Sequence, residues 1–323
     1  MSTKTSLLAM LAATAVMAAA CQKNAEAPQA GAPVVLKIAS QKGGTRALME
    51  ASHALDGAGY KVEWSEFPSA QTLLEALADG AVDAGAVGDA PFMFAYSSGA
   101  KIKVVQAYRA SAGGASTAVV VRNGSPIRSI ADLKGKLIAT GKGSIGDYLL
   151  LRVLEQAGLK PSDVTTVYLA PGDAKAALAA GSVDAWATWN PYVALATLHG
   201  DARVLVDGRG LLHAIGFEAA SQGAIQSKSA QLADFLHRLA KAEQWESQHQ
   251  DEFATRLAKE TGLPADVAHV TIANQRPTAV PIDPSVVAEE KETLAHFQAA
   301  GLIDKAPAVE GAFDTDFKGA VRP

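Results

Sequence analysis

The chain has 323 residues, of which 49% are hydrophobic and 19% are charged, and it contains 28 glycines, 14 prolines and one cysteine. These proportions exclude collagen, coiled coils and disordered chains, and the length is enough for about two domains with separate cores. The formal net charge is only −4, so the composition does not provide the broad basic face that binds DNA or RNA. We therefore predict no nucleic-acid partner.

Residues 1–20 predict a signal peptide. Lys4 precedes an apolar run from residue 7 to residue 20, which is too short to span a bilayer comfortably but has the size of a signal hydrophobic segment. The run ends in three alanines directly before Cys21, the only thiol of the chain. This position predicts lipidation of Cys21 after cleavage, and ordinary signal cleavage is the alternative. Both interpretations place the mature protein outside the cytoplasm.

From residue 21 to residue 33 the chain is rich in Ala, Pro and Gln and offers little to bury. We expect this segment to form a flexible, lipid-anchored tether. From Val34 onward, strand-like runs such as 34–39 and 61–67 alternate with helical stretches. This alternation predicts an α/β fold with mostly parallel sheets.

The chain also contains an internal echo, with one copy at residues 74–92 and the other at residues 176–192. In each copy a helix ends at a glycine, a short strand follows, and a proline opens the next helix. Upstream of each copy, a strand ends in a glycine-containing turn, Gln41–Thr45 in the first and Thr140–Ser144 in the second. The echo predicts two lobes of one plan, with both turns at the sheet edge where open α/β sheets bind ligands.

Two extended runs, Thr117–Arg122 and Gly216–Ser221, are expected to be the crossovers between the lobes. On this interpretation the first lobe contains residues 34–116 and 222–323, and the second lobe contains residues 117–221. The crossovers would act as a hinge. The helical C-terminal third would return to cover the first lobe.

Residues 141–146 read G-x-G-x-x-G between a strand and a helix, which is the pattern of dinucleotide-binding turns. A dinucleotide site also needs an acidic residue at the end of the next strand, where this chain has Ala170 and Pro171. A P-loop would need Ser or Thr after Lys142, where Gly143 stands. We therefore predict no cofactor.

Both glycine turns are candidates for binding an anion. A turn that enters a helix leaves backbone N–H groups unpaired at the positive end of the helix dipole, and a hydroxyl lies beside each turn, on Thr45 and Ser144. The alternative is that these hydroxyls only cap their helices. Two turns that face one cleft can share one ligand, whereas a cleft lined mainly by acidic groups would contradict the prediction. The candidate residues are Lys42, Gly43, Gly44, Thr45, Arg109, Gly143 and Ser144.

Further candidates follow the short strands of the echo. Trp186 and Trp189 could wall an apolar tail of the ligand, although Trp186 could instead pack in the core. Asp83 and Asp184 occupy equivalent positions, and their repetition predicts helix capping or a turn rather than catalysis. The remaining pocket candidates, whose polar members could accept from a ligand amine or orient donors, are Gly88, Asp89, Asn190 and Glu218.

The sequence shows no catalytic constellation. It lacks H-E-x-x-H and G-x-S-x-G motifs, and its seven histidines are scattered without metal-ligand spacing. We therefore predict that the chain is not an enzyme and binds no metal. An enzyme stays open as the alternative, because catalytic triads assemble from distant residues.

Several motifs are spread over roughly residues 34–222, and they include Gly88-Asp89-Ala90-Pro91, ADLKGK at 131–136, YLAP at 168–171 and VDAWATWNPY at 183–192. Together they resemble the motifs of the substrate-binding proteins of ABC importers for aliphatic sulfonates and taurine.

This resemblance implies a bilobal periplasmic-binding-protein fold with a two-strand hinge. It also implies that the protein captures a small organic anion, foremost an aliphatic sulfonate, between its lobes. A membrane permease driven by a separate ATPase would receive the ligand from a periplasmic, lipid-anchored monomer.

The resemblance leaves the ligand open, because Asn190 stands where family members often have Asp. Binders of taurine, nitrate, bicarbonate or thiamine precursors are alternatives. A pyrimidine-synthesising enzyme on the same fold is a further alternative, but those relatives rely on a Cys-rich segment, whereas this chain has one cysteine.

Overall fold

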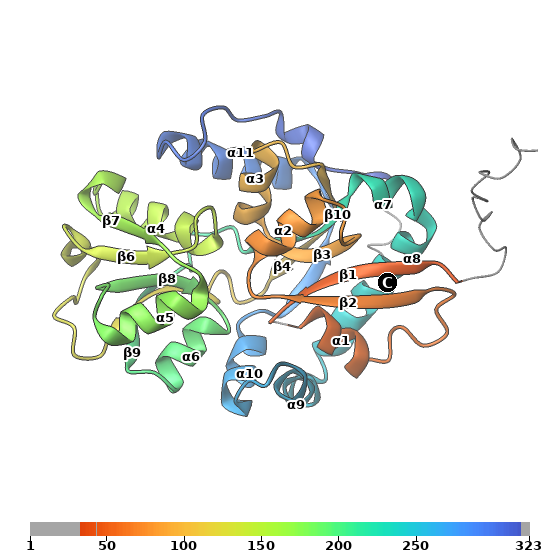
Figure 1. Ribbon diagram of the computed structural model, residues 1–323, viewed down its shortest axis with the longest axis horizontal. Helices are drawn as coiled ribbons and strands as arrows, with labels where there is room; N and C mark the ends of the chain where they lie inside the picture. Colours follow the sequence, from red (N-terminus) through yellow and green to blue (C-terminus); the bar gives the residue numbers. More distant parts are fainter. Residues whose placement is uncertain (1–32, 43, 318–323) are drawn as a thin grey trace, which may run out of the picture. The chain divides into compact units, whose positions relative to one another are not determined.

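Two mixed β-sheets organise the structure, a computed structural model that describes residues 33–42 and 44–317 (Figure 1). In order across the first sheet, the strands are β11 (Pro277–Val280), β4 (Ile102–Ala110), β10 (Ile215–Ser221), β3 (Ala84–Gly88), β1 (Val35–Gln41) and β2 (Lys61–Phe67). Across the second sheet they are β7 (Thr165–Tyr168), β6 (Leu137–Thr140), β8 (Ala185–Trp189), β5 (Thr117–Arg122) and β9 (Ala202–Asp207). The chain from Val34 onward forms one compact unit. The predicted signal peptide, Cys21 and the tether up to residue 32 lie outside the described residues.

Helices lie on both faces of each sheet. Those associated with the first sheet are α1 (Thr45–Ala51), α2 (Ala70–Ala78), α3 (Asp89–Ser97), α7 (Gln222–Ser227), α8 (Ser229–Glu246), α9 (Gln250–Thr261), α10 (Ala265–Ala273) and α11 (Pro284–Ala299). Those of the second sheet are α4 (Ile145–Gln156), α5 (Pro171–Ala180) and α6 (Tyr192–Leu198). Short 3₁₀ helices are η1 (Ile130–Leu133), η2 (Pro161–Asp163) and η3 (Val309–Ala312). Within the described ranges, no helix combines the length and apolar character needed to span a bilayer.

The strand directions differ in part from the prediction of mostly parallel sheets. β1 is parallel to β2 and β3, and β6 is parallel to β7 and β8. β10 and β5 instead run antiparallel to β3 and β8. Both of these strands begin directly after the chain has crossed from the other sheet. The crossings therefore add antiparallel strands to a parallel core in each sheet.

The two faces of the first sheet have separate cores. On one face, α3 and α11 enclose Phe92 and Phe297, and on the other face, α8 and α9 enclose Leu236 and Leu257. Full burial of each such side chain contributes about 1.5–3 kcal/mol. The helices after β10 thus cover the first sheet, as we predicted.

The two copies of the echo have the predicted local structure. Each contains a helix, a glycine with positive φ, a strand and then a second helix: α2, Gly80, β3 and α3 in the first copy, and α5, Gly181, β8 and α6 in the second. Pro91 lies in the first turn of α3, and Pro191 directly precedes α6.

The repeated aspartates of the echo join neighbouring strands. Asp83 Oδ2 accepts from the Lys37 N–H at 2.7 Å and is 2.7 Å from Lys228 Nζ. Asp184 Oδ2 accepts from the Leu137 N–H at 2.9 Å. Both aspartates lie in the bends that precede β3 and β8 and accept from the main chain of β1 and β6, so the predicted helix capping is wrong and the alternative of a turn stays.

Two connecting segments, residues 111–116 and 208–214, join the sheets. The first lobe in this article is the first sheet with its helices, and the second lobe is the second sheet with α4, α5 and α6. Because β10 pairs with β3 and β4, the chain is back in the first lobe by Ile215, earlier than the predicted boundary at residue 222.

The two connecting segments run side by side. The Gly208 N–H donates to the Thr117 C=O at 2.9 Å, and the Ala110 N–H donates to the Ala214 C=O at 2.9 Å. Gly114 has φ +88°, and a Cβ there would lie 2.6 Å from the Gly208 oxygen. A side chain at position 114 would therefore separate the segments.

Candidate ligand-binding site

A cavity of about 240 Å³ lies between the lobes, at the carboxyl ends of β1, β3 and β8. The first lobe contributes the turn after β1 and the start of α3, and the second lobe contributes the start of α4 and the end of β8. Nine of the predicted site residues line it: Lys42, Gly44, Thr45, Gly88, Asp89, Ser144, Trp189, Asn190 and Glu218. The cavity thus gathers residues from both copies of the echo.

The two glycine turns face the same cavity. Gly44 and Thr45 line it from the first lobe, and Ser144 and Ile145 line it from the second lobe. Lys42 is exposed at its rim. Gly43 lies outside the described residues.

The start of α4 has a reciprocal cap. Ser144 Oγ accepts from the Asp147 N–H at 3.1 Å, and Asp147 Oδ2 accepts from the Gly143 N–H at 2.9 Å. Gly143, predicted to bind the ligand through its N–H, uses that N–H within the cap and does not line the cavity. Burial raises the pKa of Asp147 to about 6.

One N–H group of α4 is available at the cavity. The Ile145 and Gly146 N–H groups donate to no other residue in the described part of the chain, but of the two only Ile145 lines the cavity. These N–H groups lie at the positive end of a 12-residue helix. The Ser144 hydroxyl hydrogen takes no part in the cap but points to Thr140 Oγ1 at 3.4 Å, because the Thr140 hydroxyl donates its own hydrogen to the Ala187 C=O at 3.0 Å.

Asn190 adds a donor from the end of β8. Its Oδ1 accepts from the Ala194 N–H at 3.2 Å and thereby caps α6. Its Nδ2 is buried and has no hydrogen-bond partner among the described residues. Because Asn190 lines the cavity, this amide can donate to a bound anion.

The aromatic residues divide between cavity and core. Trp189 lines the cavity and meets Tyr192 edge to face, with ring centroids 5.8 Å apart. The Tyr192 hydroxyl donates to the Pro68 C=O of the first lobe at 2.8 Å. Trp186 is only 1% exposed in the core beside α5 and α6, because side chains alternate along β8. Trp186 is therefore a core residue and not part of the cavity wall.

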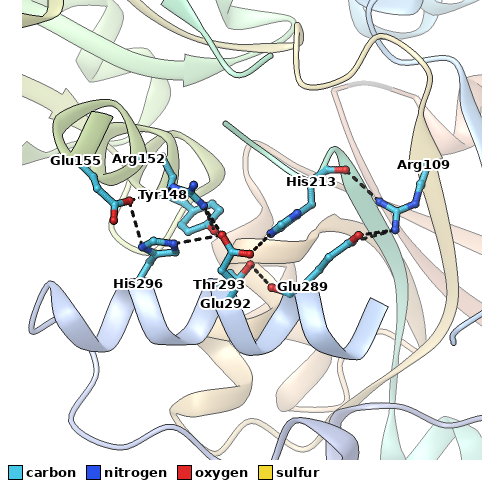
Figure 2. Close-up of polar contacts among 9 residues, drawn as sticks. All are labelled: Arg109, Tyr148, Arg152, Glu155, His213, Glu289, Glu292, Thr293 and His296. Atoms are coloured by element: carbon cyan, nitrogen blue, oxygen red, sulfur yellow. Dashed lines mark hydrogen bonds and ion pairs between the residues drawn. The ribbon is translucent and has the colours of Figure 1, made fainter. Parts of the chain in front are cut away.

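Arg109 is held away from the cavity. Its guanidinium pairs with Glu289 of α11 at 2.8 Å and donates to the His213 C=O at 3.2 Å (Figure 2). It does not line the cavity. The predicted contribution of Arg109 to an anion site is therefore not supported by its position.

Four carboxyl groups line the cavity: Asp89, Glu218, Glu243 and Glu246. Burial raises the pKa of Asp89 to about 7, with a further rise from Glu289. Burial also raises the pKa of Glu243 and of Glu246 to about 8, and that of Glu218 well above its usual value. These carboxyls therefore hold protons at pH values where an exposed carboxyl is ionised. An anion site needs no carboxyl groups, and this cavity has four. Apart from Lys42, the other residues that line it are uncharged.

Glu243 and Glu246 are cavity residues that the sequence analysis missed. They continue a stripe of α8 that includes Leu232, Leu236 and Leu239, at the spacing of three and four residues that defines one helix face. The change from Leu to Glu along that stripe is the signal that could have identified them. No group of three or more His, Cys, Asp or Glu side chains in the described ranges could hold a metal ion.

Comparisons with known proteins agree with this architecture. The NMT1/THI5-like family model matches residues 56–253. An Escherichia coli (strain K12) protein named for binding aliphatic sulfonates is 36% identical over 277 residues, 84% of this chain and 86% of that protein. A Bacillus subtilis (strain 168) protein of the same name is 30% identical over 82% of this chain and 79% of that protein.

A solved structure is similar over nearly the same part of the chain. The alkanesulfonate-binding protein from Xanthomonas axonopodis pv. citri bound to MOPS has a TM-score of 0.82 and 35% identity, covering 88% of this chain and 99% of that chain. Because the family model spans more than half of the chain and these relatives align over most of it, the chain belongs to the NMT1/THI5-like family.

Proposed function

We propose that this protein is the extracytoplasmic solute-binding component of an ABC importer and that its ligand is an aliphatic sulfonate. The observation that carries the ligand class is the set of free donors that two segments of the second lobe direct to one cavity: the Ile145 N–H and Asn190 Nδ2. The similarity to alkanesulfonate-binding and aliphatic sulfonates-binding proteins supports it. Binding, rather than catalysis, is the activity we infer.

The sulfonate head would accept hydrogen bonds at the start of α4. Three oxygens of one negative group suit several donors, here from Ile145 and Asn190, with Lys42 and Thr45 across the cavity. The carbon chain would pack on Trp189, Tyr192 and Leu212. A sulfonate in this position contacts both lobes.

Capture depends on contacts with both lobes, because a ligand that binds one lobe alone does not shift the equilibrium between open and closed forms. In this structure the lobes already meet across the cavity. The Tyr192 hydroxyl donates to the Pro68 C=O at 2.8 Å, and Gln71 Nε2 donates to the Lys142 C=O at 3.4 Å. We infer that a bound sulfonate stabilises this closed arrangement for delivery to the permease.

Export and anchoring belong to the same proposal. A signal peptide at residues 1–20, lipidation at Cys21 and a tether to residue 33 would hold a monomer at a membrane beside its permease. The periplasmic location in the name of a related taurine-binding protein of Escherichia coli (strain K12) supports an extracytoplasmic site of action.

Isothermal titration calorimetry with alkanesulfonates, taurine, sulfate and nitrate tests the proposal. We expect an alkanesulfonate to bind in the micromolar range or tighter, with a rise in melting temperature on ligand addition. Binding of no sulfonate below millimolar concentration, together with tight binding of a sugar or of a purely cationic ligand, would refute it. An alkanecarboxylate of equal length is the control for the head group.

A further inference from the structure

Two seams join the lobes outside the cavity lining, and each seam contains a histidine beside a carboxylate. The first seam lies between α4 of the second lobe and α11 of the first lobe, and the second seam lies between α6 of the second lobe and α10 of the first lobe. Figure 1 shows α11 at the top of the view and α10 at the bottom, so the seams are separate contacts. A change in conditions that acts on both seams therefore acts on closure as a whole.

The first seam has more carboxylates than permanent cations. The Arg152 guanidinium of α4 lies 3.3 Å from Glu155 and 2.8 Å from Glu292 of α11 (Figure 2). His296 of α11 reaches the same two carboxylates, with Nδ1 3.5 Å from Glu155 and Nε2 3.5 Å from Glu292. His213 of the connecting segment lies 3.6 Å from Glu292. When both imidazoles are neutral, one guanidinium faces two carboxylates, and a proton on either histidine balances the charge.

The neighbouring groups do not alter this balance. The Tyr148 ring lies 5.9 Å from the His296 ring, and burial raises the pKa of the Tyr148 phenol, which keeps it neutral. Arg109 donates to the His213 C=O, but its guanidinium is paired with Glu289. Imidazole is the side chain that ordinarily changes its charge between about pH 5 and pH 8. The histidines are therefore the groups that can change the charge of this seam in that range.

The second seam is an apolar contact that ends in one ion pair. Ala194 of α6 packs with Leu263 and with Val267 of α10. His199 follows the last residue of α6, and its Nε2 lies 2.9 Å and 3.0 Å from the two carboxyl oxygens of Asp266 in the first turn of α10. The hydrogen bond from His199 lowers the pKa of Asp266. Within the described residues, no Lys or Arg pairs with Asp266, so this carboxylate depends on the imidazole for a cation.

We propose that closure of the two lobes is linked to protonation of His199 and His296, which form ion pairs between the lobes in the closed form. Since each pair joins residues of different lobes, opening separates the partners. Protonated imidazoles gain these partners in the closed form alone, so a lower pH favours closure. Linkage is reciprocal, so a ligand that closes the lobes takes up protons. The inference rests on the proposed function for the ligand that drives closure.

Isothermal titration calorimetry with butane-1-sulfonate tests the proposal, because this probe stays ionised at every pH used and exchanges no proton itself. We expect its affinity to fall at least about three-fold from about pH 5.5 to about pH 8, as two partly exposed ion pairs are lost. We also expect proton uptake on binding, seen as a binding enthalpy that changes with the ionisation enthalpy of the buffer. Phosphate and imidazole buffers serve here, since neither carries a sulfonate group that could compete.

The acids of the cavity also titrate, so a variant isolates the contribution of the histidines. The double variant His199→Gln/His296→Gln keeps two polar side chains that cannot gain the charge. We expect it to bind about three- to ten-fold more weakly than the parent at about pH 5.5 and similarly at about pH 8. His53→Gln is the matched control, because His53 lies 3.7 Å from Asp56 within the first lobe. Circular dichroism and melting curves verify the fold of each variant.

A double-mutant cycle assigns the effect to one pair. In sulfonate affinity, the coupling between His199→Gln and Asp266→Asn should be about two-fold or more at about pH 5.5 and disappear near pH 8. The coupling between Arg152→Gln and Glu292→Gln should persist at both pH values, since a guanidinium keeps its charge. A coupling between the His199 and Asp266 variants that is equal at the two pH values would overturn the proposal.

Small-angle X-ray scattering gives a readout that needs no ligand. The radius of gyration of the ligand-free protein should increase from about pH 5.5 to about pH 8, and the double histidine variant should have the larger value already at the lower pH. If butane-1-sulfonate binds and the parent and the double variant share one pH dependence of affinity, the inference fails and the proposed function stays. If this sulfonate does not bind, the proposed function fails, and an equal pH dependence of the two radii would overturn the inference as well.

Discussion

Ser144 illustrates how one hydroxyl can serve both the fold and the ligand. Its oxygen caps α4 by accepting from Asp147, and its hydrogen makes only a long hydrogen bond of 3.4 Å to Thr140 Oγ1, which a ligand oxygen at the cavity would replace. The two substitutions Ser144→Ala and Ser144→Gly separate these roles, because glycine at an N-cap costs only a few tenths of a kcal/mol whereas alanine costs about 1 kcal/mol. We expect both variants to lose sulfonate affinity by about 1 kcal/mol, and only the alanine variant to lose as much stability.

Urea denaturation and calorimetry measure the two quantities for the Ser144 variants. Full affinity in Ser144→Gly would show that the hydroxyl only caps the helix. Ser129→Gly, at the start of η1 and absent from the cavity lining, is the control for a changed N-cap elsewhere.

Asp83 offers the opposite case, a buried carboxylate that belongs to the fold alone. It accepts from the main chain of β1 and pairs with Lys228. It lies at the amino end of β3, whereas the cavity lies at the carboxyl end of that strand. We expect Asp83→Ala to lower the free energy of unfolding by about 1–3 kcal/mol, because the Lys37 N–H would lose its partner. Sulfonate affinity should stay unchanged. A variant with normal stability in urea and weakened binding would contradict this assignment.

At the scale of elements, α11 and α4 join the two lobes through a polar network (Figure 2). Arg152 of α4 donates to Glu292 of α11 at 2.8 Å, and His296 lies 3.5 Å from Glu155. Although burial opposes the shift, Arg152 and His213 hold the pKa of Glu292 below its usual value. The network therefore favours contact between the lobes.

Removing this network should weaken ligand binding without touching the cavity. We expect Arg152→Gln and Glu292→Gln each to reduce sulfonate affinity by about 0.3–1 kcal/mol, and the double variant to lose no more than either alone. Calorimetry on the four proteins of this cycle gives the coupling. Arg209→Gln is the control, since Arg209 of the connecting segment pairs with Asp207 of β9 and not across the lobes. Additive losses in the cycle would exclude a shared contact.

A substitution at Gly143 tests whether close contact between the second lobe and α3 is needed for binding. A Cβ at Gly143 would lie 2.4 Å from the Phe94 ring, whereas a Cβ at Gly158 would meet nothing within 4 Å, and the two residues have nearly equal φ values of +66° and +68°. Gly158→Ala therefore isolates the backbone strain of about 1 kcal/mol. We expect Gly143→Ala to weaken sulfonate binding beyond Gly158→Ala, because opening of the lobes relieves the clash. Equal affinities of the two variants by calorimetry would show that this contact does not limit closure.

The elements that the sequence predicted well are those with local signals. β2 begins and ends at the expected residues 61 and 67, and the glycines and prolines of the echo mark real element ends. Local signals could not predict that β10 belongs to the first sheet, because its partners β3 and β4 are distant along the chain. Pairing across such distances leaves no local pattern beyond an apolar run.

The same distinction applies to the candidate site. The turns at Thr45 and Ser144 could be predicted to share a cavity, because a repeated unit carries its turn to the same place in each lobe. The position of Arg109 could not, because its partner Glu289 lies 180 residues away. The acids of α8 required knowledge of which helix covers the cavity.

At the scale of the whole molecule, the buried carboxyls predict the pH dependence of stability. In the unfolded chain these groups ionise near pH 4, whereas in the fold Asp89 has a pKa of about 7 and Glu243 and Glu246 have pKa values of about 8. Between these values the folded state holds more protons than the unfolded state, so the free energy of unfolding decreases as the pH rises.

We therefore expect the melting temperature of the ligand-free protein to fall from about pH 5 to about pH 8, and a Glu243→Gln variant to show a shallower fall. Differential scanning calorimetry across this range measures both. Glu252→Gln, an exposed change at the start of α9, should follow the parent profile. A melting temperature that stays constant or rises between these pH values would show that the acids ionise freely in the fold.

The second lobe is inserted into the chain of the first lobe, and the two connecting segments that join them are adjacent. Ala118 lies opposite Asp207 in the ladder between β5 and β9, so the chain enters and leaves this lobe at neighbouring positions. We expect a corresponding segment of a relative to be graftable between these positions with only two junctions. We therefore expect chimaeras to combine the α4 and Asn190 donors of one protein with the first lobe of another.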